Sequence, residues 1–314
     1  MSSAPSLPPV TATNPGRVLG SIDEAIGHTP LVRLHLEGVP AGVEIWGKCE
    51  WFNPGGSVKD RTALSIVTEG ERSGALGPGK TIIDSSSGNT AVGLALVGRA
   101  RGYAVELVMP TSVTEERKRL CEAYGATIVF TDAFSGSDGA LLKVRERVAA
   151  EPERYFYADQ YRNPANPLAH YRTTGPEIWE QTAGRITHFV AGLGTTGTVV
   201  GTGRMLHERK RGVQVVAVEP DEPLHGLEGL KHLESAIVPE IWDPKVPDRV
   251  LHVSTESGLL CCAEVMATDG LFVGHSAGAA LWAARAVAQG LSRGVVVALL
   301  CDGGDRYLSA RAAR

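Results

Sequence analysis

Short runs of β-branched and aliphatic residues alternate with helix-forming segments along most of this chain. Each apolar run precedes a segment of helical composition, as in VEIWGKCEW, TIIDSSS and AVELVMP, and later in THFVAGLG, VQVVAVEP and GVVVALLCD. This alternation predicts parallel sheets with crossover helices, an α/β fold. In open α/β sheets, ligands bind at the carboxyl ends of the strands, where loops meet helix N-termini.

The alternation is interrupted at mid-chain by the stretch NPANP, residues 163–167. We therefore predict two open parallel-sheet α/β domains with a cleft between them. The predicted N-terminal domain spans residues 35–159, and the C-terminal domain combines residues 18–34 with residues 160–314. Residues 1–17 are rich in Pro, Ser and Thr and are predicted to form a disordered tail.

Composition excludes several classes of function. A formal net charge of −4 gives no general electrostatic reason to bind nucleic acid or anionic lipid. No window resembles a membrane span, and the first 17 residues lack the apolar core of a signal peptide, so we expect a cytoplasmic protein. The five cysteines are scattered and lack C-x-x-C spacing, so neither a disulfide framework nor a metal site is indicated.

The stretch GLGTTG, residues 192–197, follows a predicted strand and opens a helix. Read literally it is G-x-G-x-x-G, and with Glu219 near the end of the next strand it fits a dinucleotide site. However, glycine-flanked N–H groups at a helix N-terminus bind any phosphate. Hydroxyls from Thr195, Thr196 and Thr198 suit a terminal monophosphate better, and both interpretations stay open at this point.

The stretch DSSSGNTAVG, residues 84–93, also joins a predicted strand to a helix. Its polar residues could cap the helix and do nothing more, because Ser and Asn are favoured N-caps. One cap needs one such residue, so this cluster favours a loop that binds a carboxylate. The candidates are Ser86, Ser87, Asn89 and Thr90.

The stretch NPGGSVKDR, residues 53–61, places Lys59 at the predicted start of a helix. Lysine is unfavourable there because the helix dipole already contributes positive partial charge. An amine that must be neutral to attack a carbonyl gains from such a site. Lys59 is therefore a candidate Schiff-base lysine, and the implied cofactor is pyridoxal 5′-phosphate, with its phosphate held elsewhere in the chain.

Together, NPGGSVKDR, SSSGNT, GTTGT and CDGGDRYLS resemble the cysteine synthase (O-acetylserine sulfhydrylase) group of fold-type II pyridoxal-phosphate enzymes, which share the tryptophan synthase β-like fold. The resemblance runs from about Leu19 to Ser309. The stretch HYRTTGPEIWEQTAGRITHFVAGLGTTGT and the ending CDGGDRYLS look most like the cysteine synthase B branch. The resemblance also implies a homodimer that acts on small molecules.

The resemblance implies a role for each candidate residue. Lys59 would hold the cofactor and then carry out acid-base work at the substrate Cα. Asn89 would bind the phenolic oxygen of the cofactor, and Ser276 would face its pyridine nitrogen. The α-carboxylate would be held by Ser86, Ser87, Thr90 and Gln160, and the phosphate by Gly194, Thr195, Thr196, Gly197 and Thr198.

The predicted reaction is β-replacement, in which O-acetyl-L-serine and sulfide give L-cysteine and acetate, with thiosulfate as a possible second sulfur donor. Lys231 stands where relatives that use phosphoserine have arginine, so it is a candidate reader of an anionic group, although such a lysine is as often a solvated surface charge. Alternatives are O-phosphoserine sulfhydrylase or cystathionine β-synthase-like activity and, in a different class, a nicotinamide-dependent dehydrogenase.

Overall fold

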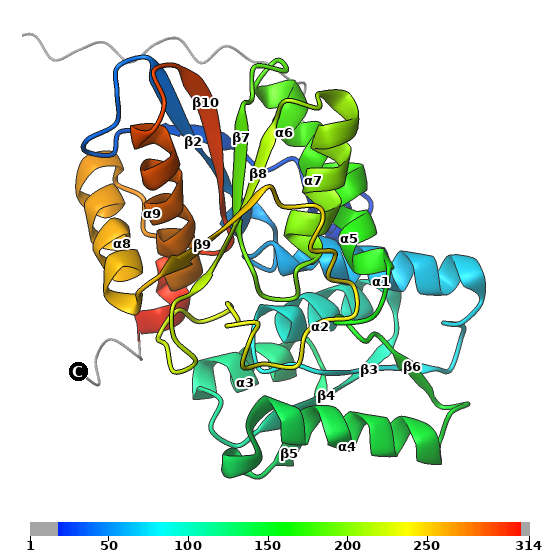
Figure 1. The fold of residues 1–314 in the computed structure, drawn as a ribbon. Coiled ribbons are helices and arrows are strands. Elements are labelled where there is room, and N and C mark those ends of the chain that lie inside the picture. Colours follow the sequence, from blue (N-terminus) through cyan, green and yellow to red (C-terminus); the bar gives the residue numbers. More distant parts are fainter. Residues whose placement is uncertain (1–17, 309–314) are drawn as a thin grey trace, which may run out of the picture.

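The computed structural model describes residues 18–308, so the tail predicted at residues 1–17 lies outside the described residues. Two sheets form its frame (Figure 1). The larger sheet has the order β1-β2-β10-β7-β8-β9 and the smaller has the order β5-β4-β3-β6. The first sheet consists of β1 (Leu31–Leu34), β2 (Val43–Cys49), β10 (Gly294–Leu300), β7 (His188–Gly192), β8 (Gln214–Pro220) and β9 (Arg249–Val253). The second consists of β5 (Thr127–Thr131), β4 (Ala104–Pro110), β3 (Thr81–Ser85) and β6 (Tyr155–Tyr157).

Neighbouring strands run parallel in both sheets, except that β1 pairs antiparallel with β2. This architecture confirms the predicted α/β class. The strand β2 falls inside the range 35–159, yet it pairs along its whole length with β10 in the six-stranded sheet. The partner of a strand lies far along the chain and is not encoded in the local pattern. The division into domains itself stays a prediction.

Helices cover both faces of each sheet. The long helices are α1 (Lys59–Ser73), α2 (Asn89–Arg101), α3 (Glu115–Ala123), α4 (Gly136–Ala150), α7 (Gly197–Arg209), α8 (Thr255–Asp269) and α9 (His275–Gln289). The shorter ones are α5 (Ala165–Ala169), the π-helix η4 (His170–Thr174), α6 (Gly175–Gln181) and the 3₁₀ turns η1 (Ile22–Ala25), η2 (Glu50–Phe52), η3 (Ala133–Ser135) and η5 (Gly304–Tyr307).

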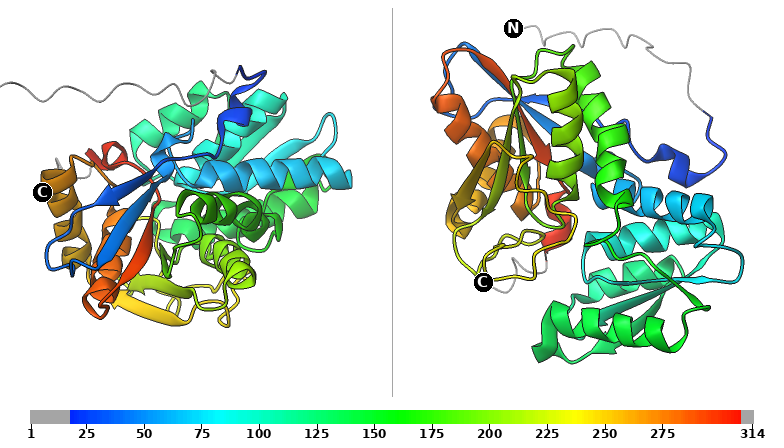
Figure 2. Two further views of the ribbon diagram at one scale, coloured as in Figure 1. Left: turned by 90° about the horizontal axis from the view of Figure 1, so that it is seen from above. Right: turned by 45° about the vertical axis from the view of Figure 1, so that its right-hand side comes forward.

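Side chains that alternate along β8 contact helices on opposite faces of the larger sheet, so this sheet is buried on both faces. Val216 and Val218 pack in the core that contains α8 and α9, whereas Val215 and Ala217 pack in the core with α6 and α7. Successive side chains of a strand point to opposite faces, so both faces are apolar. Figure 2 shows the two sheets with their helices as two lobes. In the described part of the chain, we found no helix long and apolar enough to cross a membrane.

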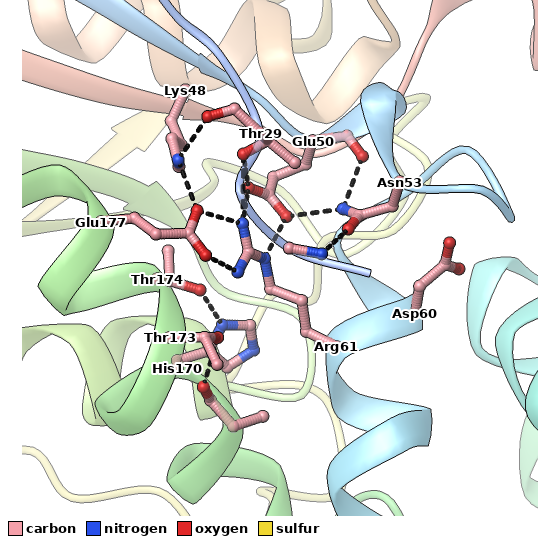
Figure 3. A network of polar contacts seen from close by, with 12 residues as sticks. Thr29, Lys48, Glu50, Asn53, Asp60, Arg61, His170, Thr173, Thr174 and Glu177 are labelled. Carbon is pink, nitrogen blue, oxygen red and sulfur yellow. Dashed lines mark hydrogen bonds and ion pairs between the residues drawn. The ribbon is translucent and has the colours of Figure 1, made fainter. Parts of the chain in front are cut away.

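A buried cluster of charges holds the start of α1 in place (Figure 3). The guanidinium of Arg61 binds both oxygens of Glu50, at 2.7 and 2.9 Å, and both oxygens of Glu177 on α6, at 2.6 and 2.8 Å. The ammonium of Lys48 on β2, which is fully buried, binds Glu177 at 2.6 Å and the carbonyl oxygen of Thr29 at 2.7 Å. Two cations and two carboxylates thus balance inside the protein and join β2, η2, α1 and α6.

Replacing Glu177 by Ala should destabilise the fold strongly, because Lys48 and Arg61 stay buried while they lose their shared carboxylate. Removing one partner from a buried ion pair typically costs about 3–5 kcal/mol. Urea unfolding followed by circular dichroism measures the loss. Glu180→Ala is the matched control, since Glu180 lies exposed on the same helix. Equal losses in the two variants would contradict this account.

The same carboxylate predicts a dependence of stability on pH. Burial raises the pKa of Glu177, but the hydrogen bonds and charges of Arg61 and Lys48 outweigh burial and bring the pKa down from 4.5 to about 2. A depressed carboxyl pKa stabilises the fold above the unfolded value, and this contribution disappears as the pH falls through the folded value. The stability gap between wild type and Glu177→Ala should therefore narrow between pH 4.5 and pH 2.

Candidate active site

A cavity of about 410 Å³ lies where the loops that follow β3 and β7 meet the start of α1. Its wall contains most of the residues predicted from the sequence: Lys59, Ser86, Ser87, Asn89, Thr90, Gln160, Gly194, Thr195 and Lys231. Four predicted residues are not among the wall residues that the structure describes: Thr196, Gly197, Thr198 and Ser276. The carboxyl ends of β3 and β7, which belong to different sheets, therefore bring separate polar loops to one cavity.

Lys59 is the first residue of α1 and is half-buried at the cavity wall. The chain before it is attached to the end of β10, because the N–H of Val58 donates to the carbonyl oxygen of Cys301 at 2.9 Å and Ser57 forms a bridge with Asp302. The helix start is thus fixed both by the larger sheet and by the charge cluster around Arg61. The lysine amine is presented to the cavity from a rigid base.

The two glycines before Lys59 are required by close approach. A Cβ at Gly55 would lie 2.5 Å from the carboxylate of Asp60. Gly56 has φ +78°, and a Cβ there would lie 2.3 Å from the guanidinium of Arg306. A side chain at either position would collide with a charged group.

Ser86, in the loop after β3, caps the start of α2 and keeps its hydroxyl proton free. Its hydroxyl oxygen accepts the N–H groups of Gly88, at 3.4 Å, and Ala91, at 3.1 Å, at the start of α2. Because the oxygen accepts both bonds, the hydroxyl proton stays free to donate. Thr90 behaves differently, since its hydroxyl donates to Oε1 of Gln160 at 2.7 Å. The helix N-terminus, Ser86 and the remaining proton of Gln160 face one part of the cavity and suit an anion.

Asn89 is held from two sides by residues near the C-terminal end of the described chain. Its amide nitrogen donates to Asp302 at 2.7 Å, and its oxygen accepts from Arg306 at 2.9 Å. These partners fix the orientation of the amide and leave one Nδ2 proton for another acceptor. Burial raises the pKa of Asp302, and hydrogen bonds from Tyr307 and Asn89 oppose this rise.

The loop after β7 forms a tight cradle around the start of α7. A Cβ at Gly194 would lie 2.3 Å from the carbonyl oxygen of Gly229, and one at Gly197 would lie 2.1 Å from Oδ1 of Asn166. Thr196 adopts the left-handed conformation, with φ +71°, and its buried hydroxyl has no hydrogen-bond partner within residues 18–308. A strained residue with an unpaired buried hydroxyl at a helix N-terminus is suited to bind an anion such as a phosphate group.

Ser276 lies behind the cavity wall. It is the second residue of α9, is 3% exposed, and its hydroxyl would be 3.9 Å from a Cβ built at Gly229, which does line the cavity. The hydroxyl of Ser276 thus lies next to a residue of the cavity wall. The structure therefore brings Ser276 close to the other candidates without placing it in the wall.

Lys231 is half-buried and faces the cavity. Its ammonium lies 4.9 Å from the centre of the Tyr161 ring, a cation–π distance. Its backbone N–H donates to the carbonyl oxygen of Leu193 at 2.7 Å. Burial lowers the pKa of Lys231, and the charge of Asp138 opposes that effect. This environment differs from that of a solvated surface lysine.

The sequence analysis did not identify the residues that hold the candidate site residues in place. Asp302, Arg306 and Tyr307 belong to CDGGDRYLS, a stretch that carried the family resemblance but received no roles. Asn166 and His170 also support the loop after β7. Asn166 carried no signal beyond being polar, and His170 opens HYRTTGPEIW, a stretch that carried the family resemblance but gave this residue no role. The carboxylate of Glu219, which a dinucleotide site would require, instead accepts the N–H of Leu233 at 3.0 Å.

The family model described as pyridoxal-phosphate dependent enzyme matches residues 22–302, and the chain belongs to this family. The predicted cofactor and the predicted family are thereby confirmed. The chain is 51% identical to a cysteine synthase from Aquifex aeolicus (strain VF5) over 296 residues, which cover 92% of this chain and 90% of that protein. It is 40% identical to cysteine synthase B from Escherichia coli (strain K12), over 93% of this chain and 95% of that protein.

Solved structures agree. Cysteine synthase from Entamoeba histolytica superposes with a TM-score of 0.90 at 34% identity, covering 98% of this chain and 93% of that chain. An O-ureido-L-serine synthase superposes with a TM-score of 0.88 at 39% identity, covering 93% of this chain and 94% of that chain. The G-x-G-x-x-G stretch therefore belongs to a pyridoxal-phosphate fold.

Borohydride reduction of the cofactor-loaded protein, followed by peptide mapping, should place a stable cofactor adduct on Lys59, because its amine faces the cavity from the helix start. Lys59→Ala should yield no adduct. The matched control is Lys231→Ala, which removes the other lysine of the cavity wall and should leave the adduct on Lys59. An adduct on any other lysine of the wild type would contradict the assignment.

Proposed function

We propose that this protein makes L-cysteine from O-acetyl-L-serine and sulfide, with acetate as the leaving group. The observation that carries the proposal is the convergence of three groups on one cavity: an amine at a helix start, an anion-binding loop after β3, and a second such loop after β7. Similarity to proteins named cysteine synthase supports the choice of substrate within the pyridoxal-phosphate family.

The residues present fit the cofactor. Residues 194–198 would hold its phosphate, Asn89 its phenolic oxygen, Ser276 its pyridine nitrogen and Lys59 its aldehyde. The unpaired hydroxyl of Thr196 and the cradle that a Cβ would fill support the phosphate assignment. When bound, the cofactor supplies a carbonyl carbon for amines and a ring that withdraws electrons from the substrate Cα.

The substrate carboxylate would be held at the start of α2. Ser86 can donate its free hydroxyl proton, Ser87 lies at the cavity wall, and Gln160 has one amide proton left after its other bonds. Because the hydroxyl of Thr90 already donates to Gln160, Thr90 would contribute its backbone N–H and fix the Gln160 amide. By holding the carboxylate, these donors would keep the substrate Cα–H bond within reach of Lys59.

Lys59 would carry the proton transfers. The amine of Lys59 would take the proton from the substrate Cα, which would allow acetate to leave from Cβ. After sulfide adds at Cβ, the same residue returns the proton to Cα. Facing the pyridine nitrogen, the hydroxyl of Ser276 would not keep that nitrogen protonated as a carboxylate would. The cofactor would then supply only moderate electron withdrawal, which favours loss of the leaving group.

The protein loaded with pyridoxal phosphate should form cysteine from O-acetyl-L-serine and sulfide, as measured by a colorimetric cysteine assay. Lys59→Ala, which lacks the group that moves the proton, should lower kcat by several orders of magnitude. A protein that binds the cofactor but gives no cysteine from this pair would refute the proposed substrate. Tight binding of NAD would instead contradict the class of enzyme.

Lys231 supports a proposal about a wider range of substrates. Its partly desolvated ammonium at the cavity wall could contact an O-phospho group or thiosulfate, whereas an acetyl ester offers no charge. Loss of one charge-assisted contact, about 1.5 kcal/mol, corresponds to roughly a tenfold loss in kcat/KM. Lys231→Ala should therefore cut the use of O-phosphoserine or thiosulfate about tenfold and change O-acetylserine use by only a few fold.

Lys231→Arg is the matched control, because it keeps the charge and should retain or improve the use of anionic substrates. Equal losses for neutral and anionic substrates in Lys231→Ala would mean that the residue only supports its loop. A cytoplasmic location, a homodimer and a cystathionine β-synthase-like activity stay predictions of the family resemblance.

A further inference from the structure

His170 lies buried on the far side of the loop after β7 and contacts three hydroxyl groups. Its Nε2 is 3.2 Å from Oγ1 of Thr198 and 3.4 Å from Oγ1 of Thr62, and its Nδ1 is 3.0 Å from Oγ1 of Thr174. The π-helix His170–Thr174 brings the last of these pairs together (Figure 3). Such π-helical turns are rare and are frequent at functional sites.

The orientation of the neighbouring Asn166 amide is fixed by an acceptor. One amide atom lies 2.7 Å from the carbonyl oxygen of Gln160, which can only accept, so that atom is Nδ2. The same nitrogen donates to Oγ1 of Thr195 at 3.1 Å. Consequently Oδ1 of Asn166 faces Thr62, at 3.3 Å from its hydroxyl oxygen.

The single hydroxyl proton of Thr62 is used by that bond. Oδ1 of Asn166 has no proton, so Thr62 must donate to it, and only lone pairs of Thr62 remain for the imidazole. If Nε2 of His170 carried no proton, its lone pair would face a lone pair of the Thr62 hydroxyl oxygen. Nε2 of His170 therefore carries a proton, which points at the oxygens of Thr62 and Thr198.

The other ring nitrogen follows from the neutrality of the ring. Burial first, and then the charges of Arg61 and Lys59, lower the pKa of His170 well below its ordinary value, so the ring holds one proton. Nδ1 is then an acceptor, and Thr174 donates its hydroxyl proton to it. Every polar atom of the imidazole has a partner with the correct proton count.

We propose that His170, held as the Nε2–H tautomer, is a positioning residue that turns the hydroxyl proton of Thr198 toward the cofactor phosphate. Thr198 accepts from His170 and so keeps its own proton for the anion. With the opposite tautomer, Thr198 would spend its proton on His170 and present lone pairs to a phosphate. This inference rests on the phosphate position proposed above for residues 194–198.

Two substitutions distinguish donation from packing. Gln places an amide N–H near the position of Nε2, whereas Asn reaches only to the position of Nδ1, and neither fills the volume of the ring. His170→Gln should keep the dissociation constant for pyridoxal phosphate within about threefold of wild type, and His170→Asn should raise it about tenfold. Equal weakening in both variants would mean that His170 only packs.

A double-mutant cycle separates failure of this inference from failure of the phosphate assignment. Thr198→Val alone should weaken cofactor binding roughly tenfold or more, and His170→Asn should add little in that background, since it acts through Thr198. If Thr198→Val changes nothing, the phosphate assignment is wrong. If Thr198→Val weakens binding but the effects of Thr198→Val and His170→Asn add fully, only the inference about His170 is wrong.

Nuclear magnetic resonance gives a readout independent of affinity and activity. The ¹⁵N shifts of the His170 ring in the holoenzyme should show a protonated Nε2 and an unprotonated Nδ1. The ³¹P resonance of the bound cofactor should move in His170→Asn and stay near the wild-type position in His170→Gln. A protonated Nδ1, or a ³¹P resonance unmoved in both variants, would overturn the proposal.

Discussion

The buried guanidinium of Arg61 is the contact on which the rest of the site depends. It is 2% exposed and makes paired bonds to Glu50 and Glu177. Because it lies two residues after Lys59, its position determines where α1 begins and where the amine enters the cavity. A buried ion pair contributes little net stability compared with apolar packing, but it tolerates few geometries. In this chain the cluster holds the helix start in one orientation against the larger sheet.

A second set of contacts, made of neutral groups, connects the loops that follow β3 and β7. Thr90 donates to Oε1 of Gln160, and the backbone carbonyl oxygen of Gln160 accepts from Nδ2 of Asn166. Oδ1 of Asn166 in turn accepts from Thr62. From Thr62 the contacts continue through His170 to Thr198. Each hydroxyl and amide has a limited number of protons, so the direction of one bond constrains the other bonds of the same group. One set of hydrogen bonds therefore links the loop after β3 with the loop after β7.

Much of the fold followed from local patterns. Parallel sheets were predictable because strand and helix periodicities alternate, and the polar loops were identifiable because they stand between a strand and a helix. The pairing of β2 with β10 was not predictable, because those strands are separated by most of the chain. The same holds for the support of Asn89 by Asp302 and Arg306, which lie more than 200 positions away in the chain.

The sequence by itself determined the chemistry available to this protein: a lysine at a helix start, two loops rich in donors, and the family to which these motifs belong. These features depend on neighbouring residues, which the linear order specifies directly. Tertiary structure decided which of these groups share a cavity, how far Lys231 is desolvated, and that the hydroxyl proton of Ser86 stays free while that of Thr90 is donated to Gln160. These properties depend on contacts between segments that are distant in the sequence. A side chain becomes buried, and its hydrogen bonds take a direction, only when folding brings those segments together.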